Sequence, residues 1–268
     1  MSDEISGRGD PLKSLQLLWG RTEAPRRGPK AKARVEDLVS AAVAIADEEG
    51  LAAVSTRRVA DAVGISAMSF YTHIPGKAEL LDLMMDAVSG EVLKNRPVFE
   101  PAQWRTNLTR VATEYRNFYL AHPWVIQLAT HRTVLGPNTF QSADIALSAV
   151  EGLGLTDLEM DRVITMVLDY VHGAVRNAAR EKMVKELTGM TDEEWWYRVA
   201  PFLETLDFTP YPVLARVGKT AGEAYGAHDP EGAFAFGLAR VLDGLTVFIE
   251  SKTASAPKKA RGTLGQER

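Results

Sequence analysis

A stretch of small polar side chains between positions 55 and 77 contains the residue types that contact a nucleic-acid duplex. Hydroxyls, a phenol, a thioether chain and an imidazole occur there, and no carboxylate lies between Asp61 and Glu79. Hydroxyl groups and methyl-bearing chains reach base edges in the major groove, where a wall of carboxylates would be unsuitable. We therefore expect a DNA-reading surface made of Ser66, Ala67, Met68, Ser69, Tyr71, Thr72 and His73.

The spacing within this stretch predicts two short helices joined by a tight turn. Ser55 is a suitable N-cap for the first helix, and Ser66 for the second. Gly64 lets the chain turn where another side chain would be strained. The first helix has one apolar face, made of Val59, Ala60 and Val63. An ordinary helical hairpin in an all-helical protein would show the same pattern, so the flanking residues must decide between the two.

The flanks resemble the DNA-binding domain of TetR-family transcriptional regulators. In that family a glycine ends the first helix, a Thr-x-x-x-Val/Ile-Ala-x-x-x-Gly-Val/Ile segment and an aromatic-bearing recognition helix follow, and a lysine begins the next helix. The matching positions here are Gly50, Thr56, Val59, Ala60, Gly64, Ile65, Phe70, Tyr71 and Lys77. The resemblance implies that the helix after Lys77 couples a ligand to DNA binding. We expect Thr56 and Arg57 to contact the DNA backbone or a groove edge, and Tyr71 and Lys77 to hold phosphates.

Composition is that of a soluble globular protein. The chain has 268 residues, 46% hydrophobic and 25% charged, with a net charge of -4 and no cysteine. That length suits a small head and a larger body, each with a core. The absence of cysteine excludes disulfides and thiolate zinc sites. We expect a cytoplasmic protein without a membrane span, a secretory signal, a cofactor or a metal.

Positive charge is concentrated ahead of the helical stretch, in residues 21–34. Six basic residues face the single acid Glu23 there, which gives a local charge of +5 despite the acidic total. Proline and glycine should keep this segment extended. We interpret residues 1–32 as a flexible basic arm that contacts DNA through Arg26, Arg27 and Lys30. A solvated leader without a partner is the alternative.

Helical periodicity continues to the end of the chain, so the expected fold class is all-α. We assign residues 33–80 to a three-helix DNA-binding head, 81–251 to a helical ligand-binding and dimerisation domain, and 252–268 to a disordered tail. Thr156 and Glu159 form a capping box that begins a long helix, and the last strong helix follows Asp229. In the family such helices form a four-helix bundle, so the resemblance implies a homodimer. The alternative for their apolar faces is an intramolecular core.

The body resembles the tetracycline-repressor type of C-terminal domain, yet its polar drug contacts are missing. The positions of two histidines and an asparagine in that repressor fall at Leu93, Val111 and Ala129, and only an aromatic at Tyr115 is kept. Neither tetracycline nor magnesium is therefore expected. A small, largely hydrophobic or aromatic effector suits the remaining lining. The candidate contacts are Leu93, Val111, Tyr115, Tyr119, Trp124, His131, Met166, Tyr170 and His172, for which ordinary core packing is the alternative.

An enzyme is the competing class. The chain lacks a Gly-x-Ser-x-Gly elbow, a phosphate-binding glycine loop and a His-Glu-x-x-His motif. Asp169 and His172 could form half of a helical-bundle metal site, but no second copy occurs. We thus expect no catalytic residues, and a ligand-responsive repressor that binds a palindromic, double-stranded operator as a dimer. An activator, or a regulator without a ligand, remains the alternative.

Overall fold

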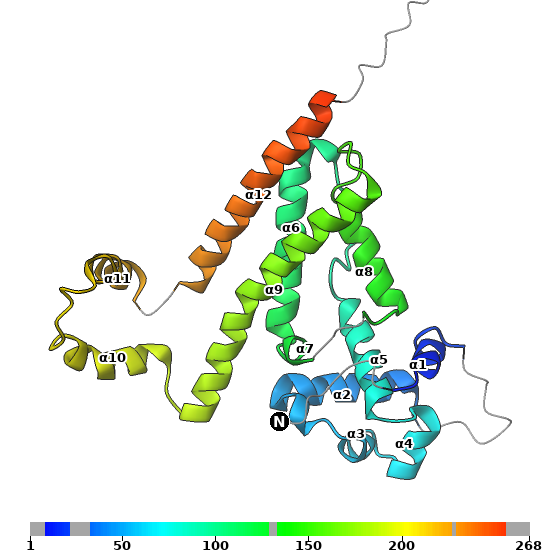
Figure 1. The fold of residues 1–268 in the computed structure, drawn as a ribbon. Helices are drawn as coiled ribbons and strands as arrows, with labels where there is room; N and C mark the ends of the chain where they lie inside the picture. Colours follow the sequence, from blue (N-terminus) through cyan, green and yellow to red (C-terminus); the bar gives the residue numbers. More distant parts are fainter. Residues whose placement is uncertain (1–8, 22–32, 129–132, 227–228, 256–268) are drawn as a thin grey trace, which may run out of the picture.

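The computed structural model describes residues 9–21, 33–128, 133–226 and 229–255, without the side chains of 177–187 and 253–255. These residues form only helices, as expected for an all-α chain (Figure 1). The elements are α1 (Pro11–Leu18), α2 (Val35–Glu49), η1 (Leu51–Ala53), α3 (Thr56–Val63), α4 (Ala67–His73), α5 (Lys77–Ser89), η2 (Pro101–Gln103), α6 (Trp104–Ala121), α7 (Trp124–Gln127), α8 (Pro137–Ser148), α9 (Asp157–Thr188), α10 (Asp192–Leu203), α11 (Pro212–Tyr225) and α12 (Pro230–Ser255).

Helices α2, α3 and α4 form the head, and α5 leads from it into the body (Figure 1). The apolar side of α2 buries Leu38, Val39, Ala42 and Ala46 against the neighbouring helices. Gly50 ends α2 with a φ of 84°, a left-handed value that favours glycine. The predicted three-helix head is therefore present.

Residues Pro11–Leu18 form a helix, so the expectation of a flexible arm is wrong for this segment. Asp10 caps α1, because its carboxylate accepts from the amide of Leu12 at 3.0 Å. The helix packs on α5, and Ser14 is 5% exposed there. An eight-residue helix is marginal in isolation, so docking on α5 supplies most of its stability.

Helix α5 has a stripe of three buried carboxylates along one side. Glu79, Asp82 and Asp86 are each at most 7% exposed, and each accepts hydrogen bonds from another element. Asp86 accepts from the amide and the hydroxyl of Thr139, both at 2.9 Å, at the start of α8. Gly136 permits this approach, since a Cβ there would collide with the Asp86 carboxylate. The stripe therefore holds α5 against the elements beside it.

The body is built on α6, α9 and α12, with α8 on one side (Figure 1). The capping box of α9 is confirmed, because the Glu159 carboxylate accepts from the Thr156 amide at 2.9 Å. Two helices, α10 and α11, extend from the body between α9 and α12, and neither contains a buried residue. The last helix reaches Ser255, so the assignment of a disordered tail from residue 252 is wrong for its first residues.

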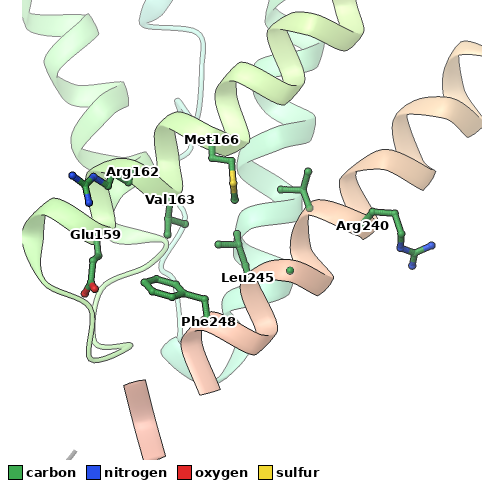
Figure 2. A pocket seen from close by; sticks show the side chains of 9 residues that line it. Glu159, Arg162, Val163, Met166, Arg240, Leu245 and Phe248 are labelled. Atoms are coloured by element: carbon green, nitrogen blue, oxygen red, sulfur yellow. The ribbon is translucent and has the colours of Figure 1, made fainter. Parts of the chain in front are cut away.

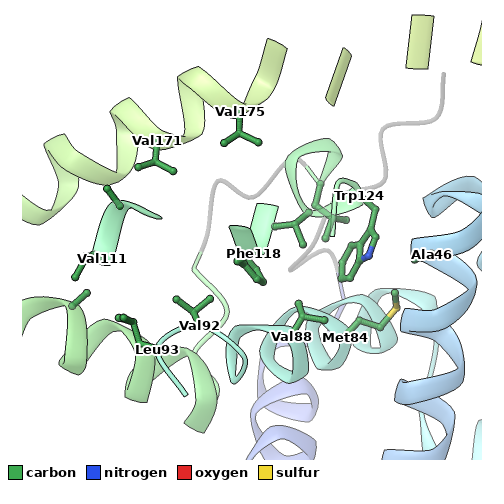
Figure 3. Packing of buried hydrophobic residues seen from close by; sticks show 14 of the residues in the cluster. Ala46, Met84, Val88, Val92, Leu93, Val111, Phe118, Trp124, Val171 and Val175 are labelled. Carbon is green, nitrogen blue, oxygen red and sulfur yellow. The ribbon is translucent and has the colours of Figure 1, made fainter. Parts of the chain in front are cut away.

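Head and body share one continuous hydrophobic core. Figure 3 shows Ala46 of α2 and Met84 of α5 near Trp124, and the same cluster continues through Phe118 to Val171 of α9. Side chains of the two expected domains therefore pack together, and a displacement in one is felt in the other.

Helix α12 is long and apolar enough to cross a membrane by length and composition alone. One such helix is weak evidence for a membrane span, because a core helix of a soluble protein passes the same test. Its inner side packs on α9, where Leu238, Leu242 and Leu245 are buried. Its outer side carries Phe236 and Val247, which are exposed.

Candidate nucleic-acid interface and effector site

Helices α3 and α4 meet in the predicted helix-turn-helix. Ser55 Oγ accepts from the Arg58 amide at 3.2 Å, and Ser66 Oγ accepts from the Ser69 amide at 3.1 Å. Gly64 lies between them in the left-handed region, with a φ of 75°. Phe70, which is completely buried, anchors α4 to the core of the head. The local geometry is therefore that of the expected motif.

The outward side of α4 consists of small or uncharged side chains. Met68 is 77% exposed and Tyr71 50% exposed, while Ser69 and His73 are partly buried. Ser66, Ala67 and Thr72 are exposed as well. This surface offers a thioether chain, hydroxyls and a phenol to a groove, which is the chemistry of base-edge contact. It also leaves α4 without an exposed carboxylate that would repel phosphates.

The two helices are joined by a hydrogen bond between their functional side chains. Thr56 Oγ1 and the Tyr71 hydroxyl lie 3.2 Å apart, so the first residue of α3 orients the phenol of α4. Arg57, beside Thr56, is exposed and lies 4.0 Å from Asp61. Lys77 begins α5, at the positive end of the helix dipole, which favours an anion.

Four of the proposed contacts lie outside the described residues. They are Arg26, Arg27 and Lys30 in the basic segment, and His131 in the body.

In the body, the structure brings Tyr119 of α6 close to His172 of α9, while Tyr115, one turn earlier on α6, lies near Ser142 of α8. The rings of Tyr119 and His172 are 5.6 Å apart. Burial raises the pKa of Tyr119 to about 12, with smaller contributions from Tyr115 and from Asp169. Burial also raises the pKa of Tyr115, although a hydrogen bond with Ser142 opposes that effect. Both phenols are therefore neutral and able to donate hydrogen bonds over the physiological pH range.

Leu93 and Val111 lie in the core, with exposures of 2% and zero. Leu93 has a φ of 54°, a strained value for a residue with a Cβ, and its buried side chain helps to hold this conformation. Figure 3 shows Leu93, in the segment after α5, and Val111 of α6 among the helices of the body.

Three other proposed effector contacts have surroundings that differ from those of an effector site. The Trp124 indole is buried and donates to Asp47 of the head, so we reassign it to the junction of head and body. The Tyr170 hydroxyl donates to the backbone oxygen of Phe234 at 2.7 Å, which joins α9 to α12. Met166 is 43% exposed. These side chains are explained by packing between helices or by exposure on an outer face.

Met166 lines a groove of about 550 Å³ between α9 and α12 (Figure 2). Val163, Leu245 and Phe248 give this groove an apolar floor, and Glu159, Arg162 and Arg240 lie at its edges. The groove runs along the two helices that the family resemblance assigns to dimerisation. It therefore belongs to the candidate dimer face.

The junction between α2 and the end of α6 was not recognised in the sequence. His122 Nδ1 lies 2.8 Å from Asp47 Oδ1, and its Nε2 lies 3.5 Å from a Glu91 oxygen. The sequence gives no sign of the partners of Asp47, which are 75 and 77 positions away. Among the described residues, no group of three or more His, Asp or Glu side chains is arranged to hold a metal ion.

A helix-turn-helix head with an uncharged reading surface, packed on a larger helical body, defines a DNA-binding transcription regulator. Comparison with known proteins supports the same class of protein. Residues 38–84 match the bacterial regulatory proteins of the tetR family, and residues 97–249 match the tetracyclin repressor-like C-terminal domain. The chain belongs to the TetR family of transcriptional regulators, which are not enzymes.

Individual relatives support this assignment. The HTH-type transcriptional repressor DrrR1 of Streptomyces coeruleorubidus is 40% identical over 96% of this chain and 93% of its own length. The crystal structure of apo ActR from Streptomyces coelicolor has a TM-score of 0.66 and 26% identity, covering 83% of this chain and 99% of ActR. ActR in complex with (S)-DNPA is similar to the chain at 26% identity, with a TM-score of 0.65 and coverage of 81% and 99%.

Proposed function

We propose that the protein is a dimeric repressor that binds a palindromic operator and is released by a small, largely hydrophobic or aromatic effector. The observation that carries this proposal is the exposed, carboxylate-free surface of α4 beside Thr56 and Lys77. Repression is inferred from the relative DrrR1, which is named as a repressor. The alternatives are an activator and a regulator without a ligand.

Dimerisation follows from the size of the reading head. A helix of seven residues contacts only a few base pairs, so specific binding needs two heads on half-sites about 34–36 Å apart or a multiple of that distance. The outer side of α12, with Phe236 and Val247, and the groove beside Met166 provide an apolar surface for a second copy.

Effector chemistry is inferred from the groups that meet in the body. Tyr115 and Tyr119 offer phenols, His172 offers an imidazole, and Leu93 and Val111 offer apolar walls. Such a set suits a ring system with a few oxygen acceptors. ActR, which has the same fold, has been crystallised with (S)-DNPA, and this supports a ligand site in the body.

The experiment is selection of bound fragments from a genomic duplex pool by the full-length protein at moderate salt. A two-fold symmetric motif is expected, and a variant with Met68→Ala and Ser69→Ala should lose or change it. Enrichment of unrelated sequences by both proteins would contradict operator recognition. The positions of the recovered sites decide between the two modes of action, since a repressor's sites overlap promoters and an activator's lie upstream of them.

A further inference from the structure

We propose that α1 is a brace that holds α5, the helix leading out of the DNA-binding head, against α8 of the effector domain, and so positions the head for its operator. This inference rests on the proposed operator binding for its functional consequence, but not for its structural one. The matched family regions begin at residue 38, so α1 is an addition to the part of the fold that the family shares.

The first attachment of α1 is to α5. Ser14 Oγ donates to Asp82 Oδ2 at 2.8 Å, and both side chains are only 5% exposed. Both groups are shielded from water, so breaking this bond costs more than breaking an exposed one. The bond therefore fixes the middle of α1 to the middle of α5.

A second attachment lies at the start of α1. The Asp10 amide donates to Glu79 Oε1 at 3.2 Å, one turn before Asp82 along α5. Gly9 makes room for this contact, since a Cβ there would collide with the Glu79 carboxylate. Two carboxylates of α5 are thus used to hold one short helix.

The third attachment reaches the body. Trp19, just after α1, donates through its indole Nε1 to the backbone oxygen of Leu135 at 2.9 Å. Its ring lies 5.7 Å from the ring of Phe140 in α8. The residue that ends α1 is therefore fixed to the loop before α8 and to α8 itself.

Together these contacts connect α1, α5 and α8 to one another in pairs. Asp86 already joins α5 to the first turn of α8, through Thr139. Along the chain, α5 and the segment after it connect head and body, and α1 adds a connection that precedes the head (Figure 1). With α1 docked, α5 cannot tilt against α8 without breaking the contacts of Ser14 or Trp19.

A first test uses hydrogen exchange of the full-length protein without DNA. The variant combines Ser14→Ala with Trp19→Ala, and the control is Leu12→Ala, which changes a side chain on α1 that is 68% exposed. We expect faster exchange in α5 and in the first turn of α8, with the control unchanged. Faster exchange confined to residues 9–21 would show that α1 is a passenger and would overturn the proposal. Trp19→Phe, which keeps an aromatic ring but loses the indole N–H and the five-membered ring, should give an intermediate effect.

A second test measures affinity for the selected operator. We expect the double variant to bind about fivefold or more weakly, a typical magnitude for coupling between sites, with an unchanged base preference. Parent-like affinity together with undocked α1 would contradict a positioning role. If the unmodified protein selects no operator, the proposed function fails, and the exchange experiment still decides whether α1 braces the two parts.

Discussion

The indole Nε1 of Trp124 donates a hydrogen bond of 2.7 Å to Asp47 Oδ1, and so fixes the turn after α6 to the first helix of the head. The same carboxylate oxygen lies 2.8 Å from His122 Nδ1. His122 is also 5.7 Å from the ring of Phe118, which adjoins Tyr119 in α6. A continuous set of contacts thus leads from the candidate effector site to α2.

Asp47→Ala should destabilise the protein, because it leaves the buried indole N–H without its acceptor. Loss of such a partner costs about 1–3 kcal/mol, and we expect the free energy of unfolding to fall by that amount in urea denaturation. Glu48→Ala is the matched control, since its neighbouring side chain is exposed. Equal stability of the two variants would show that the Asp47 contact contributes nothing.

Tyr71→Phe should weaken operator binding without changing the selected sequence. The variant loses the bond to Thr56, which orients the ring, and a bond of this kind contributes about 0.5–1.5 kcal/mol. Thr56→Val should have a similar effect, and the double variant should be no weaker than either single one. Additive losses in this cycle, measured by fluorescence anisotropy, would mean that the two hydroxyls act independently.

Replacing Met68 should change which DNA sequences are bound, whereas replacing Lys77 should change the affinity for all sequences. Met68→Ala should change base preference at defined positions, because this side chain is the most exposed apolar group on α4. Lys77→Ala should weaken binding to all sequences about equally and lower the salt slope by about one, as expected for one phosphate contact. Selection experiments and salt titrations of both variants distinguish these roles, and an altered motif for Lys77→Ala would refute its assignment.

Val247→Asp should convert the proposed dimer into monomers, because it places a charge on the outer side of α12. Val247 is 71% exposed in the single chain, and we propose that the partner covers it. Val98→Asp is the control, as Val98 is 92% exposed and lies in the segment between α5 and α6. Light scattering after size exclusion gives the mass of each variant, and a dimeric Val247→Asp protein would place the interface elsewhere.

Glu159 should make stability depend on pH in the acidic range. Its carboxylate accepts from Lys252 at 2.5 Å, and this bond, with the Thr156 amide, lowers its pKa from 4.5 to about 2. A lowered pKa means that the stabilisation is present above pH 4.5 and is lost as the pH falls through about 2. Glu159→Gln should therefore reduce the fall in melting temperature over this range. Glu151→Gln, at an exposed carboxylate, should leave the curve of the parent unchanged.

The helix-turn-helix was predictable because its determinants are local. Ser55, Gly64 and Ser66 set its caps and its turn within twelve residues, and each has the conformation that its residue type favours. The effector site was less predictable, because exposure and partners depend on the packing of distant helices. Trp124 is a residue type that often contacts ligands. Only the position of Asp47 shows that the Trp124 indole contacts the head instead.

Helices α1 and α11 could not be assigned from periodicity. Eight residues are too few for a clear pattern, and α1 depends on carboxylates 68 and 69 positions away. In α11, Gly218 and Gly222 lower the helix propensity, and the helix has no buried face. In α1, capping and tertiary contacts outweigh the average tendency of the segment, whereas α11 has neither a side-chain cap nor a buried residue.

The continuous core across α2, α5, α6 and α9 limits how such regulators can be recombined. An engineer who transplants residues 33–80 onto another TetR-family body would cut through the packing of Ala46, Met84 and Trp124. A functional chimaera must therefore carry Asp47 together with His122 and Trp124, and α1 together with Leu135 and Phe140. The unit of exchange is the reading head with the surface of the body that it touches.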